Sequence, residues 1–287
     1  MNGRGWIYYN NAIVPTTAPH EQPHTALIED KSIWSICEGG KPLLVRWTTD
    51  FDCGYETDWW YVIKDTPFDI FALKAKRRYE IKKGQKNFLV KEICPGDFVE
   101  ELYKVQVEAY SAYPEKYRPK VDKNRWQASI LEQSETPGVT YLAAFSKESG
   151  ELSGYAKLTR DGRCIHFESL KTRPAFENLS VNAALVMRIM ELYDEDLRSG
   201  AYICDGSRNI RHETAFQAYL EKYFGFRKAY CRLHVVYNPT CRVMVRVLYA
   251  FRKLLKKMDG ISVVHKLNGV LLMEEILRKQ NKRGTHG

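Results

Sequence analysis

The sequence predicts an α+β fold in which a mixed sheet is flanked by helices. Three observations lead to this class. Residues 139–170 carry three strand patterns in succession, separated by turn signals, which is typical of an antiparallel meander. The apolar spacing changes to a helical period after Pro174. A strand, a helix and a long strand then follow within residues 201–237.

The meander is the clearest of these elements. Strands are predicted at 139–145 and 152–159, with a turn at 148–150 between them. Asp161-Gly162 turns the chain into a third strand at 163–170. Sequential strands joined by such short turns pair antiparallel.

The next helix has five apolar residues on one face: Val181, Ala184, Leu185, Ile189 and Leu192. Asn178 or Ser180 is placed to cap its start, and Gly200 ends it. A strand at 201–204 leads to a helix at 213–223. Gly225-Phe226 and a strand at 229–237 complete this part of the chain.

The N-terminal third mixes strands and helices. Apolar runs at 32–37 and 42–47 predict a hairpin, and further strands are expected at 58–63 and 87–93, with a helix at 69–84 between them. Asp97 is placed to cap a helix that continues to Ala109, and another helix is expected at 123–133.

Composition excludes several classes of protein. With 287 residues and 44% hydrophobic residues, the chain can bury one large core or two modest ones. No stretch approaches the roughly 18 apolar residues that span a bilayer, and no apolar signal segment begins the chain, so we expect a cytoplasmic protein. The seven cysteines form no CxxC pair and are expected to be reduced, buried thiols. The histidines are scattered, so we expect no metal site.

Positive charge is concentrated in two segments. Residues 240–287 hold eleven Lys and Arg against three acids, and the run 74–91 holds eight against the single acid Glu80. Such runs favour an anionic partner, although a solvated helix face has the same composition.

The order meander, helix, strand, helix, Gly-Phe, strand resembles the core of the GNAT acyltransferase superfamily. The segment 218–227, Ala-Tyr-Leu-Glu-Lys-Tyr-Phe-Gly-Phe-Arg, is similar to that superfamily's Y-E-K-x-G-F ending. The resemblance covers about a hundred residues, from 139 to 237. It implies a fold that transfers acyl groups to amines.

Two further segments resemble the Fem peptidyltransferase branch, whose members carry two GNAT half-domains. Residues 78–83, Arg-Tyr-Glu-Ile-Lys-Lys, match its R-x-x-I-x-K stretch. Residues 205–208, with Lys222 and Phe224-Gly225, are similar to its G-x-S … K-x-x-F-G segment, although Lys222 is displaced by one position. The resemblance implies a diverged GNAT-like half at 1–95, an acyltransferase core at 96–239 and a helical tail at 240–287. An unrelated, β-rich N-terminal decoration is the alternative for the first segment.

The resemblance places an acyl donor at the end of the strand 163–170 and at the start of the following helix, whose unpaired N–H groups would face a pyrophosphate. It implies that Ser169, Leu170, Lys171, Arg173 and Asn178 bind the donor. The superfamily's glycine-rich turn is missing here, because residues 171–178 contain no glycine. The Fem branch also lacks these glycines and takes its acyl group from aminoacyl-tRNA, a donor that the basic run 74–91 would suit.

Amine acylation needs a base, an acid for the leaving group and donors for the oxyanion. Glu168 and His166 alternate with Phe167 on one strand, so either is a candidate base, while an ion pair with a nearby arginine is the alternative role for Glu168. Tyr219 stands where many superfamily members place a tyrosine acid, and Tyr223 is its rival. Both could equally be packing residues.

Four more residues are candidates for substrate binding: Asp205, Ser207, Arg208 and Lys222. The first three follow a predicted strand, where α/β sheets bind ligands, but an Asp-Gly turn is an equal alternative.

Residues 242–257 form a basic amphipathic pattern. Apolar residues of this segment fall on one side of a helix, and arginines and lysines flank them. The helix could lie on an anionic membrane surface, or it could pack on the domain or on a second subunit.

The sequence therefore predicts an N-acyltransferase that uses acetyl-CoA or another acyl-CoA, without a metal. Its acceptor would be a small-molecule or lipid-linked amine, such as an amino sugar or a peptide-linked precursor of the cell envelope or of surface glycans. An aminoacyl-tRNA-dependent aminoacyltransferase is the first alternative, with tRNA as a partner. A non-catalytic GNAT-like binding module is the second.

Overall fold

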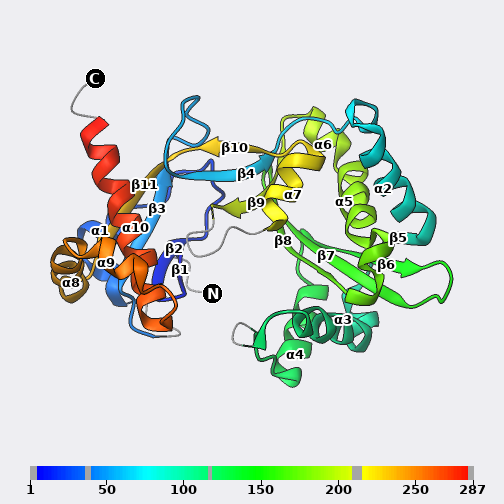
Figure 1. The fold of residues 1–287 in the computed structure, drawn as a ribbon, viewed down its shortest axis with the longest axis horizontal. Helices are drawn as coiled ribbons and strands as arrows, with labels where there is room; N and C mark the ends of the chain where they lie inside the picture. The colour runs from blue at the N-terminus through cyan, green and yellow to red at the C-terminus, as the bar shows by residue number, and fades with distance from the viewer. Residues whose placement is uncertain (1–4, 36–39, 116–117, 209–214, 284–287) are drawn as a thin grey trace. The chain divides into compact units, whose positions relative to one another are not determined.

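A computed structural model describes residues 5–35, 40–115, 118–208 and 215–283 (Figure 1). The chain forms two compact units. The first contains residues 1–62, 207–218 and 228–287, and the second contains residues 63–206 and 219–227. In the described ranges, no helix combines the length and the apolar character needed to cross a membrane.

The first unit contains a four-stranded sheet of order β1-β2-β3-β11. Strands β1 (Trp6–Tyr9) and β2 (Ala12–Pro15) form an antiparallel hairpin. Strand β3 (Leu44–Thr49) runs parallel to β2 and antiparallel to β11 (Arg232–Tyr237). The hairpin predicted at 32–37 and 42–47 is wrong, because Ser32–Ser35 forms a 3-10 helix; residues 36–39 lie outside the described residues.

Further helices of the first unit are α1 (Ala26–Glu29), α8 (Pro239–Tyr249), α9 (Arg252–Lys257) and α10 (Ser262–Arg283). The basic segment 242–257 is thus divided between two helices. Trp59 and Leu233 pack with Val245 and Leu271 in the core of this unit.

The second sheet has the order β10-β4-β9-β8-β7-β6-β5. Its strands are β4 (Trp60–Lys64), β5 (Phe88–Ile93), β6 (Val139–Ser146), β7 (Leu152–Asp161), β8 (Cys164–Thr172), β9 (Tyr202–Ser207) and β10 (Arg227–Tyr230). Strands β6, β7 and β8 pair antiparallel in succession, which confirms the predicted meander. The turns contain Gly150 and Gly162 at φ values of 73° and 56°, a conformation that glycine adopts without strain.

Helices cover both faces of the meander (Figure 1). On one face lie α2 (Ala75–Asn87) and α5 (Val181–Leu192); on the other lie α3 (Val99–Ser111) and α4 (Lys123–Ser134). The described residues of the second unit also form η2 (Ile70–Ala72), η3 (Pro95–Phe98), η5 (Pro174–Leu179) and α6 (Asp194–Arg198). Helix α7 (Ala215–Phe224) begins in the first unit and continues into the second from residue 219. This mixed architecture confirms the predicted α+β fold class.

Some local predictions are corrected. A GNAT-like half at 1–95 is predicted to enclose Trp59, Trp60 and Phe71, but Phe71 is 78% exposed, and of the three only Trp59 is buried. Asp97 lies within η3 and does not cap α3. Among the described cysteines, which are free thiols, Cys94 is exposed, contrary to the expectation of burial. The domain boundaries at 95 and 239 stay a prediction.

Candidate functional site

One edge of strand β8 opens halfway along its length. Strand β9 pairs with it in parallel at Cys164, Ile165 and His166, and the described residues show no further pairing between the two. Strand β8 nevertheless continues to Thr172 against β7 on its other side. The two parallel strands therefore diverge after His166, and the edge of β8 beyond this residue is not paired with β9.

A β-bulge lies at the point of divergence. Lys157 of β7 faces Ser169, and the next residue, Leu158, faces Phe167, so Glu168 is the extra residue of β8. Bulges re-aim side chains and are common next to functional sites. This bulge interrupts the alternation from which Glu168 and His166 were predicted to share a face, so spacing alone no longer supports that prediction.

Glu168 forms an ion pair across the two strands. Its Oε2 lies 2.6 Å from Nζ of Lys157, and the two side chains are 38% and 18% exposed. The partner is a lysine rather than the arginine considered from sequence. The pair compensates the charge of a half-buried ammonium while the carboxylate keeps contact with solvent.

Tyrosines surround this ion pair on the face that α3 and α4 cover. Tyr141 lies opposite Lys157 on β6, and its hydroxyl donates to Oε1 of Gln133 on α4 at 2.6 Å. Tyr155 lies two residues before Lys157 and donates to Oε1 of Gln106 on α3 at 2.5 Å. Burial raises the pKa of both tyrosines, so both keep their protons at neutral pH.

His166 lies beside two buried thiols. Its Nδ1 is 3.9 Å from Sγ of Cys164, and Cys204 on β9 lies opposite His166 in the parallel register. The hydrogen bond with Cys164 raises the pKa of His166. A raised pKa increases the protonated fraction of His166 at neutral pH, and only the unprotonated fraction can accept a proton.

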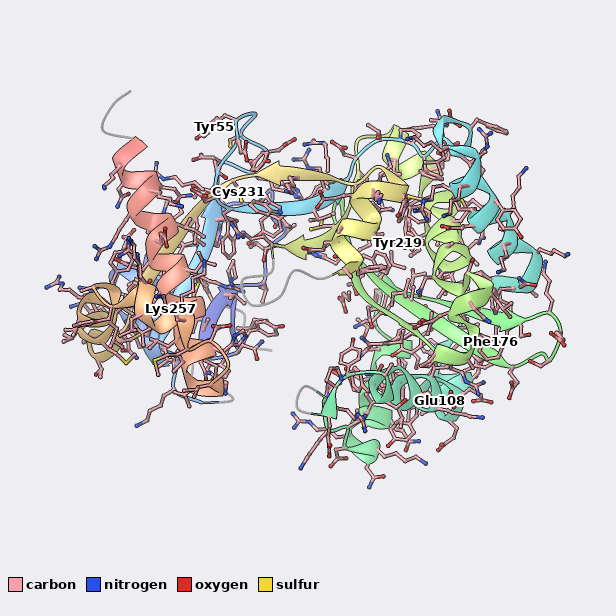
Figure 2. The ribbon with its side chains drawn as sticks, in the orientation of Figure 1. Tyr55, Glu108, Phe176, Tyr219, Cys231 and Lys257 are labelled. Carbon is pink, nitrogen blue, oxygen red and sulfur yellow. The ribbon has the colours of Figure 1, made fainter. Side chains whose placement is uncertain are left out.

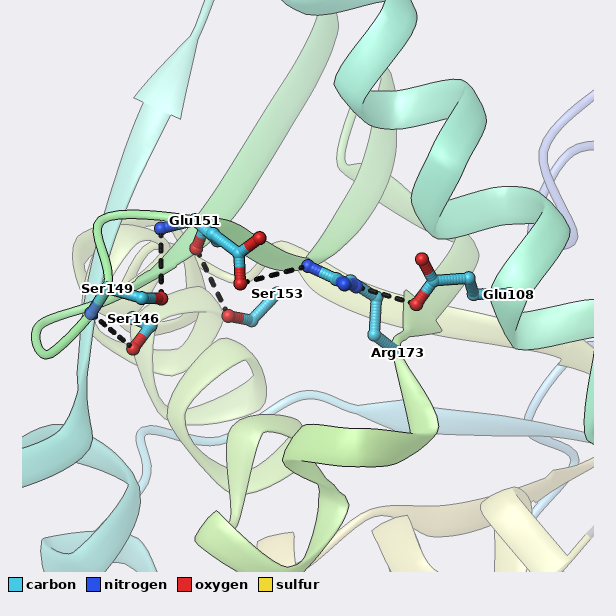
Figure 3. A network of polar contacts seen from close by, with 6 residues as sticks. All are labelled: Glu108, Ser146, Ser149, Glu151, Ser153 and Arg173. Carbon is cyan, nitrogen blue, oxygen red and sulfur yellow. Dashed lines mark hydrogen bonds and ion pairs between the residues drawn. The ribbon is translucent and has the colours of Figure 1, made fainter.

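Arg173, predicted to bind a donor phosphate, is held by carboxylates (Figure 3). Its Nε lies 2.7 Å from Oε2 of Glu108 on α3, and its Nη1 lies 3.5 Å from Oε2 of Glu151. The Arg173 side chain is only 12% exposed. Its charge is therefore already compensated within the second unit.

The other donor residues lie along the open edge and in η5. Ser169 and Leu170 are half-buried, and Lys171 has its Nζ 5.2 Å from the centre of the Tyr110 ring. Burial lowers the pKa of Lys171. Asn178 is exposed in η5 and does not cap α5; Ser180 occupies the cap position without a side-chain hydrogen bond.

Helix α2 packs tightly against the start of α5. A Cβ atom at Gly84 would lie 2.6 Å from the carbonyl oxygen of Ser180 and 3.0 Å from the nitrogen of Ala184. Only glycine allows this approach. The basic helix α2 is thereby fixed beside the α5 N-terminus, where the resemblance places the phosphates of a donor.

Tyr219 lies on α7 within an aromatic and charged cluster (Figure 2). Its ring is 5.2 Å from that of Tyr223. Arg77 of α2 stacks on the Tyr223 ring at 3.5 Å and donates to its hydroxyl, and Nζ of Lys222 lies 5.3 Å from the same ring. Burial, followed by the charge of Glu80, raises the pKa of Tyr219.

The remaining substrate residues lie at the end of β9. Asp205 is half-buried and belongs to the second unit. Ser207 and Arg208 belong to the first unit, where the Arg208 guanidinium lies 4.3 Å from the centre of the Trp60 ring. Nη1 of Arg208 donates to the carbonyl oxygen of Asp58 at 2.5 Å. The start of the helix predicted from residue 213, including Glu213, lies outside the described residues.

The second unit thus brings Glu168, Ser169, Leu170 and Lys171 to one open strand edge. Sequence reasoning missed Lys157, the partner of Glu168. A signal for it was present, since a lysine between Ala156 and Leu158 in a buried strand needs a partner. Within the described ranges, no group of three or more His, Cys, Asp or Glu side chains is placed to hold a metal ion.

Comparison with known proteins supports the fold. No family model matches the sequence, and no curated protein matches it. The structure of FemX is similar, with a TM-score of 0.52 and 9% identity over 78% of each chain. The C-terminal domain of a lysylphosphatidylglycerol synthetase from Agrobacterium fabrum has a TM-score of 0.51 and 11% identity, covering 84% of this chain and 82% of that one. L-PGS from Bacillus licheniformis has a TM-score of 0.50 and 11% identity, covering 85% and 83%. At these identities the likeness establishes the fold, which is GNAT-like and of the Fem type.

Proposed function

We propose that this protein transfers an acyl group from an activated ester or thioester to an amine, with Glu168 as the base. The observation that carries the proposal is the Lys157–Glu168 pair at the bulge where β8 separates from β9. A solvent-accessible carboxylate stands there, at the point where the described pairing of β8 with β9 ends. General bases act from within hydrogen-bond reach of the proton that they accept.

The reaction balances with the groups of this site. The amine nitrogen attacks the acyl carbonyl carbon and forms the C–N bond, while the Glu168 carboxylate accepts the nitrogen's proton. The bond from the carbonyl carbon to the leaving oxygen or sulfur then breaks, and the leaving atom takes a proton. Backbone N–H groups near Leu170 are the proposed donors to the oxyanion. Tyr219 remains the proposed acid for the leaving group.

The donor favoured by the geometry is aminoacyl-tRNA. Arg173 is compensated by Glu108 and Glu151, and the segment 171–178 has no glycine, so a pyrophosphate finds little of the usual site. Exposed lysines instead extend along α2 from its N-cap: Lys74, Lys76, Lys82 and Lys86. A helix rises about 1.5 Å per residue, so this row is longer than a diphosphate and suits a polymer of phosphates.

Acyl-CoA is the second candidate donor, because the open edge of β8 is the place where the superfamily resemblance puts a pantetheine arm, and Lys171 offers one positive charge there. The proposed acceptor is an amine on a small molecule or on a lipid-linked envelope precursor. The proposal includes a cytoplasmic location, since both donors are cytoplasmic molecules. FemX and the lysylphosphatidylglycerol synthetase domain share the fold of this chain, and this likeness supports the proposed aminoacyl transfer.

Filter binding of the full chain to bulk tRNA and to CoA, from low to moderate salt, tests the donor. We expect tRNA to bind with an affinity that falls roughly 150-fold between about 50 and 200 mM salt if four lysines contact phosphates. Lys82→Gln with Lys86→Gln should reduce the slope of log affinity against log salt by nearly two. Lys253→Gln with Lys257→Gln, exposed lysines of the first unit, is the matched control.

Charged tRNA and acyl-CoA are then incubated in turn with a panel of amines, and acid-stable amide product is measured. Transfer from acyl-CoA alone would establish the second donor. If neither donor binds and neither raises the melting temperature by several degrees, the proposal of an enzyme is contradicted and a binding module is favoured.

A further inference from the structure

The helices α8 and α9 of the first unit each have two apolar faces. The inner face packs into the core, where Cys241 and Val245 are buried and Leu248 and Leu255 lie against them. The outer face is also apolar, and its side chains remain exposed: Val243, Val247, Phe251, Leu254 and Met258. Core packing therefore accounts for only half of the apolar residues in this segment.

The outer residues follow helical spacing within each helix. Val243 and Val247 are four residues apart on α8, and Leu254 and Met258 are four apart at α9 and its end. Residues at this spacing lie on the same side of a helix. The exposed side chains thus form two short apolar rows, one on each helix, and we call these rows the outer face.

Positive charges flank the outer face. Residues 242–266 contain seven Lys and Arg and the single acid Asp259. Arg242 and Arg246 adjoin the row on α8, and Lys256 and Lys257 adjoin the row on α9; all four are exposed. Lys257 is labelled in Figure 2. Apolar side chains bordered by basic ones are typical of helices that lie in the interface of an anionic bilayer.

We propose that the outer face of α8 and α9 binds the surface of a membrane that contains anionic lipids. Two other occupants fit less well. A second copy of the chain, docked face to face, would bring the two sets of arginines and lysines together. The phosphates of a nucleic acid would contact the arginines and lysines, but single-stranded nucleic acids also stack their bases on aromatic side chains. The outer face is aliphatic except for Phe251. The proposal does not depend on the acyl-transfer chemistry.

Vesicle co-sedimentation of the full chain tests the proposal. We expect binding to phosphatidylcholine vesicles that contain about a third phosphatidylglycerol, weaker binding at high salt, and little binding to pure phosphatidylcholine. The double variant Val247→Ser, Leu254→Ser should lose about tenfold or more in partitioning, because it removes apolar groups from the bilayer contact. Leu131→Ser on α4 is the control, since Leu131 is 52% exposed and Leu254 is 58% exposed.

Sedimentation velocity and thermal melting of the same proteins complete the test. The double variant should melt at the wild-type temperature, because both substituted side chains are exposed. The proposal is overturned if the wild type does not bind anionic vesicles. It is also overturned if the double variant and Leu131→Ser both bind these vesicles as strongly as the wild type does. A wild-type dimer that the double variant converts to a monomer would also overturn it and make the outer face an interface between copies.

Discussion

The carboxylate of Glu168 lies 2.6 Å from the ammonium of Lys157, at the position where β8 carries one residue more than β7. The bulge gives Glu168 no residue directly opposite it, and the ion pair holds its side chain against Lys157 of β7. A structural ion pair and a positioned base would share this geometry. Activity measurements distinguish them.

We expect Glu168→Gln to lower the turnover of acyl transfer about 100-fold or more, because an amide cannot accept the proton of the attacking amine. Single-turnover transfer from the donor identified above is the measurement. Glu177→Gln, an exposed carboxylate of η5, should retain the wild-type rate. Tyr219→Phe should cost a similar factor if its hydroxyl protonates the leaving group. Wild-type turnover in Glu168→Gln would reject the assignment of the base.

Arg173→Gln should destabilise the second unit by about 1–2 kcal/mol. The substitution leaves Glu108 and Glu151 without their shared cation, and lost hydrogen bonds to charged groups cost this much. Urea denaturation measures the change. Arg188→Gln breaks an exposed pair with Glu191 and should change the unfolding free energy by less than about 0.5 kcal/mol. Equal effects would mean that Arg173 is not a structural link.

Gly84→Ala should destabilise the protein although alanine favours helices by about 1 kcal/mol. The new methyl group would meet the backbone of Ser180 and Ala184, which cannot move as a flexible side chain does. Overpacking typically costs about 1–3 kcal/mol, so we expect a net loss. Lys82→Ala on the exposed side of α2 is the control, and thermal and urea unfolding are the measurements. A stabilised Gly84→Ala variant would show that α2 can move away from α5.

Two histidines should give opposite pH dependences of stability. Burial lowers the pKa of His234, whose Nε2 lies 2.8 Å from Oγ1 of Thr49, so the unfolded state takes up its proton first as the pH falls. The unfolding free energy from His234 therefore decreases below about pH 6.5. The pKa of His166 is raised, so its contribution is present below about pH 6.5 and is lost as the pH rises through the folded pKa.

Urea denaturation between about pH 5 and 8 compares the wild type with His234→Gln and His166→Gln. As the pH falls, the unfolding free energy of the wild type should decrease relative to that of His234→Gln. Relative to that of His166→Gln, it should increase. If both stability differences change with pH in the same direction, the environments described for His234 and His166 are wrong.

The sequence by itself determined the meander, the helix after it and the Gly-Phe ending, because period and turn residues are local properties of the chain. Alternating apolar residues specify strands, and glycines that adopt positive φ specify the turns between them. Neither signal depends on distant residues. The order of these elements sufficed to predict the α+β class.

Only the tertiary structure decided how the candidate site is arranged. Arg173 looked like a free phosphate ligand, yet Glu108, 65 residues earlier, compensates it. The run 229–237 looked like one strand, yet it divides near Cys231 into β10 and β11, which join different sheets. Lys157 and Glu168 meet through a bulge that no local pattern encodes. Pairing between distant charges and strands depends on which surfaces the whole fold brings together, and a local period carries no information about it.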